Sequence, residues 1–289
     1  MTHLLCFGLG YSARVLAKRA QAGGWQVHGT SRTEAGAARL REAGYEASVV
    51  ADGQRGPETG SALTQATHIL LSVPPDERGD PVLESFAEAI ANCPAQWIGY
   101  LSTVGVYGDH QGGWVDEDSE LRPVSARSRR RVAAEKAWLD FGRRSGRAVH
   151  IFRLAGLYGP GRSAIDNIRA GTARRLDKPG QVFNRIHVED IANVLEASIV
   201  QPRAGAIYNV ADLEPAPPQD VVAFAAGLMG AATPPLIPFE TAELSEMARS
   251  FYGENKRVSS ALVIAELGVS FAYPTYREGL AAIAQEART

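Results

Sequence analysis

The sequence is poor in cysteine and has no long apolar run. Its 289 residues include only two cysteines, Cys6 and Cys93. Cys6 lies in a stretch that we expect to be a buried strand, so we expect a reducing compartment and no disulfide framework. No run approaches the roughly 18 apolar residues of a membrane span, and the first strand-like run starts too early for a basic leader. These absences predict a cytoplasmic protein that does not enter a membrane.

An excess of charge of one sign is absent as well. The chain carries 30 lysines and arginines against 32 aspartates and glutamates, which gives a formal net charge of −2. Neither nucleic acid nor an anionic membrane is therefore expected as a partner. No group of cysteine, histidine and acidic residues has the spacing of a zinc or iron site, so no metal is expected either.

What the sequence does contain is an alternation of short apolar runs and helical patterns over its first half. Strands are expected at residues 4–7, 25–30, 46–50, 68–72, 97–102 and 149–154. Helices are expected at residues 12–22, 34–43, 81–91 and 126–145. The strands are continuous apolar runs, which is typical of strands that are buried on both faces. The alternation predicts an α/β fold with a doubly wound parallel sheet of the Rossmann type.

The alternation breaks after residue 155. Short strands are expected at residues 181–186 and 206–210, a helix at 191–200, and helices with a turn near Gly268 in the tail. We therefore expect a Rossmann domain over residues 1–155 and a smaller, irregular, mainly helical C-terminal lobe over residues 156–289. The strand and helix near residues 182–210 are expected to return to the first domain.

The first strand runs directly into a Gly-x-Gly-x-x-Ala turn at residues 8–13, and a helical pattern follows at once. Gly8 permits the tight turn, and Gly10 lets the backbone approach a pyrophosphate. The helix that begins near Tyr11 and Ser12 would present unpaired N–H groups and its positive dipole end to the phosphates. The segment predicts dinucleotide binding, and the alternative is an ordinary structural β–α turn.

The end of the second expected strand bears on the choice of nucleotide. NAD-binding folds of this kind place a carboxylate there for the ribose 2′-hydroxyl, whereas this chain has Ser31 and Arg32. A guanidinium holds a 2′-phosphate by paired hydrogen bonds and charge, so NADP is favoured over NAD. Glu34 lies nearby, but it opens the next helix, where an acid serves the helix dipole. The alternative is that Arg32 is a solvated loop residue.

Six motifs occur in an order that is more specific than any one of them. They are the glycine turn, Val-Ala-Asp-Gly at 50–53, Leu-Ser-Thr-Val-Gly-Val-Tyr-Gly at 101–108, Arg-Leu-Ala-Gly-Leu-Tyr-Gly-Pro-Gly at 153–161, Ile-His-Val-Glu-Asp-Ile-Ala at 186–192 and Tyr-Asn-Val at 208–210. With these motifs the chain resembles the extended short-chain dehydrogenase/reductase superfamily, of the NAD-dependent epimerase/dehydratase type. The resemblance covers nearly the whole chain.

The resemblance implies roles for residues that follow the strands. It places Thr103 where the family has its catalytic serine or threonine, although a satisfied hydroxyl at a strand end is an equal alternative. The positions that it implies for the cofactor are Asp52 and Gly53 after the third strand, Ser72, Val73 and Pro74 after the fourth, and Ala155 and Gly156 after the sixth.

One departure from the family concerns its acid/base pair, a tyrosine and a lysine four residues later on the long helix after strand five. The matching positions here are Arg127 and Arg131. Arginine stays protonated in proteins, so Arg127 cannot exchange a proton with a substrate hydroxyl as a tyrosine would. The chain therefore resembles an atypical branch that keeps the cofactor fold and lacks the Tyr-x-x-x-Lys pair. Two roles are open for Arg131, a place among the arginines that could hold an anionic substrate or a pair with Glu135 one turn on.

Other candidate groups lie after strand six and in the second half of the chain. Tyr158 follows the strand that the resemblance puts nearest the nicotinamide, and it is a second catalytic candidate beside a packing alternative. Arg127, Arg162 and Arg185 could together hold an anionic substrate.

Two functions remain open. The first is an NADP(H)-dependent oxidoreductase or epimerase-like enzyme with non-standard acid/base groups, acting on a small anionic or sugar-derived molecule. The second is a catalytically silent NADP(H)-binding sensor or regulatory module. The expected partner is a small-molecule substrate or effector, and a homodimer is also open because related folds often pair through their long helices.

Overall fold

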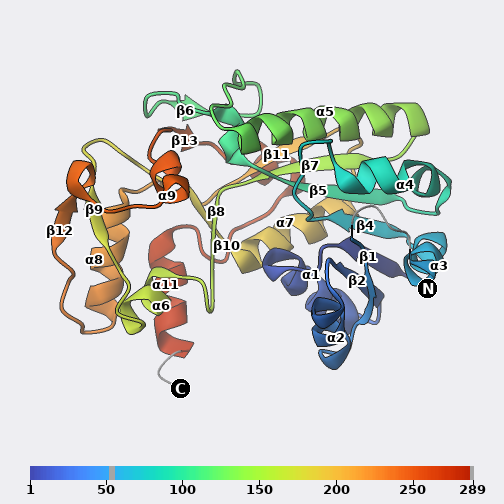
Figure 1. Ribbon diagram of the computed structural model, residues 1–289, viewed down its shortest axis with the longest axis horizontal. Helices are drawn as coiled ribbons and strands as arrows, with labels where there is room; N and C mark the ends of the chain where they lie inside the picture. Colours follow the sequence, from blue (N-terminus) through green and yellow to red (C-terminus); the bar gives the residue numbers. More distant parts are fainter. Residues whose placement is uncertain (52–55, 287–289) are drawn as a thin grey trace. The chain divides into compact units, whose positions relative to one another are not determined.

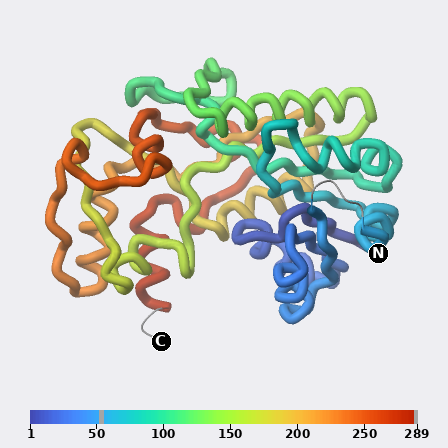
Figure 2. The backbone as a smooth tube through the Cα atoms, viewed as in Figure 1, coloured from blue at the N-terminus to red at the C-terminus, as the bar shows by residue number. Residues whose placement is uncertain are grey.

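The computed structural model describes residues 1–51 and 56–286, which form two compact units (Figure 1). Unit 1 comprises Met1–Thr103, Ala126–Arg153 and Val194–Tyr208, and unit 2 comprises Val104–Ser125, Leu154–Asn193 and Asn209–Thr289. The colours of the tube in Figure 2 let the reader follow the green and yellow segments by which the chain returns to unit 1. A change of unit at residue 154 lies next to the boundary expected at 155, but residues 104–125 belong to unit 2 and residues 194–208 to unit 1.

A seven-stranded parallel sheet forms the centre of unit 1, and its order is β11-β7-β5-β4-β1-β2-β3. The strands are β1 (His3–Phe7), β2 (Gln26–Ser31), β3 (Glu46–Val49), β4 (His68–Leu71), β5 (Trp97–Thr103), β7 (Val149–Leu154) and β11 (Ile207–Val210). The chain moves outward from β1 to β3 and then returns to β4 on the other side of β1. The predicted doubly wound α/β fold is confirmed.

Helices pack on this sheet, and their buried apolar residues show which of them lie on the same face. The helices are α1 (Tyr11–Ala22), α2 (Glu34–Glu42), α3 (Pro57–Gln65), α4 (Pro81–Asn92), α5 (Ala126–Ser145) and α7 (Val188–Val200). One buried cluster joins Leu63 of α3, Phe86 of α4 and Trp138 of α5 to the strands. These three helices therefore share one face of the sheet, and Figure 1 draws α4 and α5 side by side there.

α3 was not expected from the sequence. It is only nine residues long, and its apolar contribution to the core consists mainly of Leu63, which gives a weak helical periodicity. Pro57 at the start and Glu58 in the first turn are nevertheless ordinary signals of a helix N-terminus. The helix is therefore fixed by packing on the sheet more than by its own pattern.

Unit 2 is built from short elements. Its strands pair as three two-stranded parallel ladders, β8 (Gly156–Tyr158) with β10 (Arg185–His187), β9 (Arg175–Asp177) with β12 (Leu236–Pro238), and β6 (Trp114–Val115) with β13 (Arg257–Val258). Its helices are η1 (Val104–Tyr107), α6 (Ala164–Arg169), α8 (Pro218–Leu228), η2 (Phe239–Thr241), α9 (Glu246–Phe251), α10 (Ala261–Leu267) and α11 (Tyr276–Glu286). The strand expected at 181–186 is instead β10, which begins at Arg185 and ends one residue later than predicted, at His187. The expected turn is present, because Gly268 ends α10 with a φ of 63°. Among the described residues no helix is long and apolar enough to cross a membrane.

Candidate functional site

The candidate site of unit 1 lies at the carboxyl ends of four neighbouring strands. β5, β4, β1 and β2 are adjacent in the sheet, and the pairings between them are parallel. The loops that follow these strands therefore start from one edge of the sheet. In open α/β sheets a ligand binds at this edge, where the strand order reverses. Here the reversal falls at β1 and β4.

The turn after β1 has the geometry that its glycines predict. Gly8 has a φ of 83°, a backbone conformation that residues with a Cβ rarely adopt. Its N–H donates to Thr30 Oγ1 over 3.0 Å, and the N–H of Leu9 donates to the Thr30 carbonyl over 3.1 Å, so β2 holds the turn in place. A Cβ built on Gly10 would meet nothing within 4 Å. The backbone at Gly10 is therefore open to close approach by a ligand.

α1 begins at this turn, and no side chain caps its N-terminus. Gly10 is its N-cap residue, no side chain caps it, and its first turn contains no acidic residue. By contrast, the Thr33 side chain caps α2 through the Gly36 N–H, and Asp80 caps α4. A helix N-terminus that its own sequence does not neutralise favours an anion by its N–H groups and its dipole. The start of α1 therefore fits the diphosphate of a dinucleotide.

The loop after β2 leaves one cation exposed. Arg32 is exposed, and within residues 1–51 and 56–286 it makes no hydrogen bond or ion pair. A Cβ on Gly36 would lie 2.0 Å from Ser31 Oγ, so only glycine at this position leaves room for the Ser31 side chain against the first turn of α2. Glu34 accepts a hydrogen bond from Arg41 of the same helix at 2.5 Å, which agrees with its expected helical role.

The loop after β4 packs against the glycine turn. The N–H of Ser72 donates to the Phe7 carbonyl over 2.9 Å, and Val73 Cγ2 lies 3.1 Å from the position of a Cβ on Gly8. Pro74 follows at the surface. Asp52 and Gly53, which the resemblance implies for the cofactor, lie outside the described residues.

The end of β5 carries a buried polar cluster that the sequence did not indicate. Ser102 donates from Oγ to Glu135 Oε1 over 2.5 Å, and Thr103 is the last residue of the strand. Arg153 of β7 donates from Nη2 to Glu135 Oε2 over 2.9 Å, and both side chains of this ion pair are almost fully buried. Glu135 is thus a buried carboxylate whose charge is compensated inside unit 1.

The two arginines at the positions of the family's acid/base pair differ in their surroundings. Arg127 is exposed on α5. Arg131 donates from Nη1 to Tyr100 Oη over 2.8 Å and to the Leu101 carbonyl over 3.0 Å. The alternative in which Arg131 pairs with Glu135 is therefore wrong, because Glu135 contacts Arg153 and Ser102 instead.

Tyr100 is not a substitute for the family's tyrosine. It is fully buried under α4 and α5. Burial raises its pKa, and Arg131 only partly opposes that shift. A hydroxyl with a raised pKa that is closed off by packing cannot exchange protons with a substrate.

In unit 2, Tyr158 lies in an apolar cluster with α8 and α11. Its hydroxyl donates to the Thr275 carbonyl over 3.3 Å, and burial raises its pKa. A Cβ on Gly279 of α11 would lie 2.2 Å from the Tyr158 hydroxyl, so a glycine is required where the ring packs. This environment favours the packing alternative that the sequence left open.

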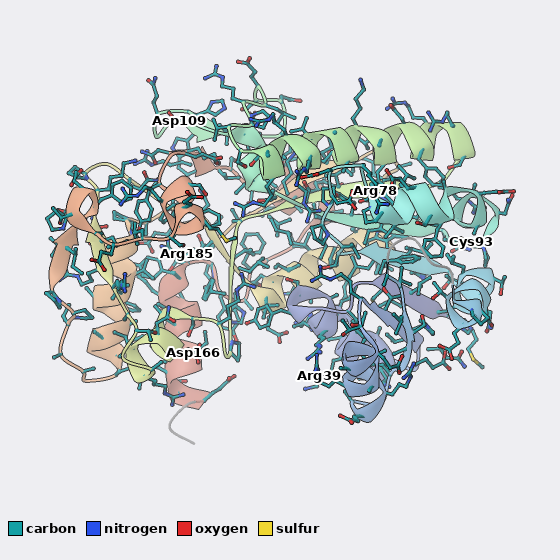
Figure 3. The ribbon with its side chains drawn as sticks, in the orientation of Figure 1. Arg39, Arg78, Cys93, Asp109, Asp166 and Arg185 are labelled. Carbon is teal, nitrogen blue, oxygen red and sulfur yellow. The ribbon has the colours of Figure 1, made fainter. Side chains whose placement is uncertain are left out.

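Arg185, which Figure 3 labels, is tied down by the backbone of unit 2. Its Nη1 donates to the Phe183 carbonyl over 3.0 Å and to the Ala216 carbonyl over 3.2 Å. Asp212 is 2% exposed, and burial raises the pKa of its carboxyl to about 8, although Arg185 acts against the shift. Nothing in the sequence around Asp212 indicated this buried acid.

The remaining predicted residues of unit 2 lie in loops or ladders. Ala155 is buried, and its N–H donates to the Val210 carbonyl over 3.0 Å. The Gly156 N–H donates to the Asn184 carbonyl, also over 3.0 Å, and Arg162 is exposed. Among the described residues no group of histidine, cysteine and acidic side chains is placed to hold a metal ion.

The open glycine turn, the uncapped α1 and the strand ends beside them define a parallel α/β fold of the dinucleotide-binding class. A family model described as the NAD dependent epimerase/dehydratase family matches residues 83–211. The chain belongs to this family, as its motifs predicted.

Three similar proteins illustrate the relationship. A functionally unknown conserved protein from Silicibacter pomeroyi is 47% identical, with 100% of both chains covered and a TM-score of 0.90. Protein YeeZ from Escherichia coli is 29% identical over 95% of this chain and 97% of that protein. The dTDP-glucose 4,6-dehydratase from Bacillus anthracis, solved in complex with NAD, shares the fold at 16% identity, with 100% and 97% of the chains covered and a TM-score of 0.80.

Proposed function

We propose that this chain binds NADP(H) at the carboxyl edge of the unit 1 sheet. The observation that carries the proposal is the start of α1, which has neither a side-chain cap nor an acid in its first turn and begins at Gly10, where a ligand can approach. The diphosphate would take the N–H groups there. Ser72, Val73 and Pro74 would pass along the cofactor, as the family resemblance implies.

The preference for NADP over NAD rests on the loop after β2. No carboxylate stands at the end of β2, and Arg32 is exposed without a partner among the described side chains. Such a guanidinium, with the Ser31 hydroxyl beside it, suits a 2′-phosphate. The dehydratase from Bacillus anthracis was solved with NAD, so the two nucleotides must be compared directly.

The chemistry that we propose is that of an oxidoreductase or an epimerase-like enzyme on a small anionic or sugar-derived substrate. The cofactor supplies hydride transfer, and the chain supplies orientation and charge. Thr103 would hydrogen-bond the reacting oxygen, and Arg127 would act as a fixed cation. Arg162 and Arg185 stay predictions as anion-binding residues, as do Ala155 and Gly156 beside the nicotinamide.

A second candidate function is a silent NADP(H) sensor. It is favoured by the state of the tyrosines, because Tyr100, Tyr107 and Tyr158 are all buried with their hydroxyls engaged. Tyr107, for example, donates to Asn209 Oδ1 over 2.7 Å. Stereospecific hydride exchange between NADPH and a panel of carbonyl compounds supports the enzyme, and tight binding without exchange supports the sensor.

Location and assembly complete the proposal. Cys6 and Cys93 are both free thiols and both buried, which suits a reducing compartment such as the cytoplasm. A homodimer stays a prediction, to be measured by sedimentation.

Binding is tested with two substitutions at one residue. Gly10→Asp places a carboxylate at the N-cap of α1, which caps the helix and repels a diphosphate. Gly10→Ala adds only a methyl group in open space. We expect isothermal titration to show NADPH binding by the wild type, weaker binding by the alanine variant, and none by the aspartate variant up to millimolar nucleotide. Equal affinity in all three proteins would contradict the proposal.

A further inference from the structure

Three consecutive residues at the end of β5 are each held by a side chain from the same face of α5. Arg131 donates to the Tyr100 hydroxyl and the Leu101 carbonyl, and Glu135, one turn later, accepts from Ser102. Residues at i and i+4 share a helix face, so both side chains belong to one interface between α5 and β5. The strand is thereby fixed up to the residue before Thr103.

The contact at Glu135 is closed off from water on every side. Arg153 donates to Glu135 Oε2 from both Nε, over 3.2 Å, and Nη2, over 2.9 Å, and the side chains are 4% and 3% exposed. An ionised carboxylate only accepts hydrogen bonds, so Ser102 must be the donor of the 2.5 Å bond. The charge of the carboxylate therefore fixes the direction in which this hydroxyl donates.

Arg131 stands at the position of the family's lysine, and its side chain belongs to this interface. The guanidinium of Arg131 contributes two hydrogen bonds to β5 and lies 5.4 Å from the centre of the Tyr100 ring. A lysine ammonium is a point charge and would not reproduce this planar contact. The side chain at this position is thus engaged with the strand.

We infer that Ser102 and Glu135 are positioning residues, which set the orientation of Thr103 toward the nicotinamide half of a bound cofactor through the anchored end of β5. The inference rests on the proposed binding of NADP(H). Neither side chain is a catalytic residue, because each acts through its neighbour.

A double-mutant cycle tests the inference with two ligands. The proteins are the full-length wild type, Ser102→Ala, Thr103→Ala and the double variant, each checked for its melting temperature. Ser102→Ala removes one bond and leaves the ion pair of Glu135 and Arg153 intact. The ligands are NADPH and adenosine 2′,5′-bisphosphate, which has the adenine half and no nicotinamide. Ser145→Ala is the matched control, because Ser145 also lies in unit 1 and, among the described residues, its hydroxyl donates only to the Phe141 carbonyl of its own helix.

We expect Ser102→Ala to raise the Kd of NADPH about 5- to 10-fold in the wild-type background and less than about 2-fold in the Thr103→Ala background. The Kd of the bisphosphate should stay unchanged in all variants, and the control should change neither ligand's Kd. Equal effects of Ser102→Ala in both backgrounds, or equal losses for both ligands, would overturn the inference. A wild type that binds neither ligand would instead refute the proposed function.

Discussion

At the scale of single residues, the charged side chains near the carboxyl edge of the unit 1 sheet fall into two groups. Some contact other groups of the protein, and others are exposed. Arg131 and Glu135 are engaged with β5, whereas Arg32 has no partner among the described residues. The guanidinium of Arg32 is exposed and can bind a phosphate through paired hydrogen bonds, and the uncapped N-terminus of α1 also favours an anion. The cation at Arg32 and the helix start at Gly10 thus point to the same class of ligand.

Arg32→Ala should separate the two nucleotides. We expect NADPH binding to weaken by about 1.5–3 kcal/mol, the range for a hydrogen bond to a charged group. Binding of NADH should change little, because it has no 2′-phosphate. Titration calorimetry with both nucleotides measures the difference, and Arg39→Ala, an exposed arginine on α2, is the control. Equal losses for both nucleotides would place the phosphate elsewhere.

His150 should make stability depend on pH. It is fully buried in β7, stacked 5.8 Å from the Trp97 ring, and burial lowers its pKa to about 4 from 6.5. Between these values the unfolded chain binds more protons, so stability is full above pH 6.5 and falls as the pH drops toward 4. The loss that His150 causes between pH 7 and pH 5 should be about 1–2 kcal/mol.

The variant His150→Phe isolates this effect, because a phenyl ring keeps the stacking and removes the titrating group. Urea unfolding at both pH values should show a pH dependence smaller by the same amount in the variant. His28, His68 and His187 also have lowered pKa values, and the subtraction cancels their contributions. An unchanged pH dependence in His150→Phe would contradict the assignment.

At the scale of elements, α5 stabilises unit 1 through two kinds of ion pair that differ in burial. Glu135 and Arg153 are almost fully buried, whereas Arg130 and Glu77 are 37% and 86% exposed. Removing one partner of a buried pair leaves an uncompensated charge, but an exposed pair is screened by water. The same helix therefore offers a matched comparison.

Glu135→Ala should lower the free energy of unfolding by about 3–5 kcal/mol. Arg130→Ala should lower it by no more than about 1 kcal/mol. Urea titrations followed by circular dichroism measure both changes. Similar losses in the two variants would show that the buried ion pair contributes no more to the free energy of unfolding than the exposed one.

The sequence predicted the elements whose signals are local. The glycine turn, the apolar strands and the long helix all follow from residues that are close in the chain, and the structure confirms them. It did not predict the partners of Glu135, because Ser102 and Arg153 lie 33 and 18 residues away. The ladder of β6 and β13 was missed for a different reason, because two-residue strands have no periodicity to detect.

At the scale of the whole molecule, the most direct consequence of nucleotide binding is added stability. A ligand that binds only the folded state stabilises it by about 2.7 kcal/mol at a concentration 100 times its Kd. We expect NADPH to raise the denaturant midpoint by more than equimolar NADH. Arg32→Ala should abolish the difference between the two nucleotides. No shift with either nucleotide at millimolar concentration would remove the basis for the proposed function.

The path of the chain through its two units limits how the molecule can be divided. The chain changes unit after residues 103, 125, 153, 193 and 208, so neither unit is a continuous piece. A fragment that stops near residue 155 would lack β11, the neighbour of β7 at the end of the sheet. It would also lack Ser198, which accepts the indole N–H of buried Trp97. β7 would then be a bare apolar edge strand, and such a fragment should aggregate by strand pairing between copies rather than fold as a domain.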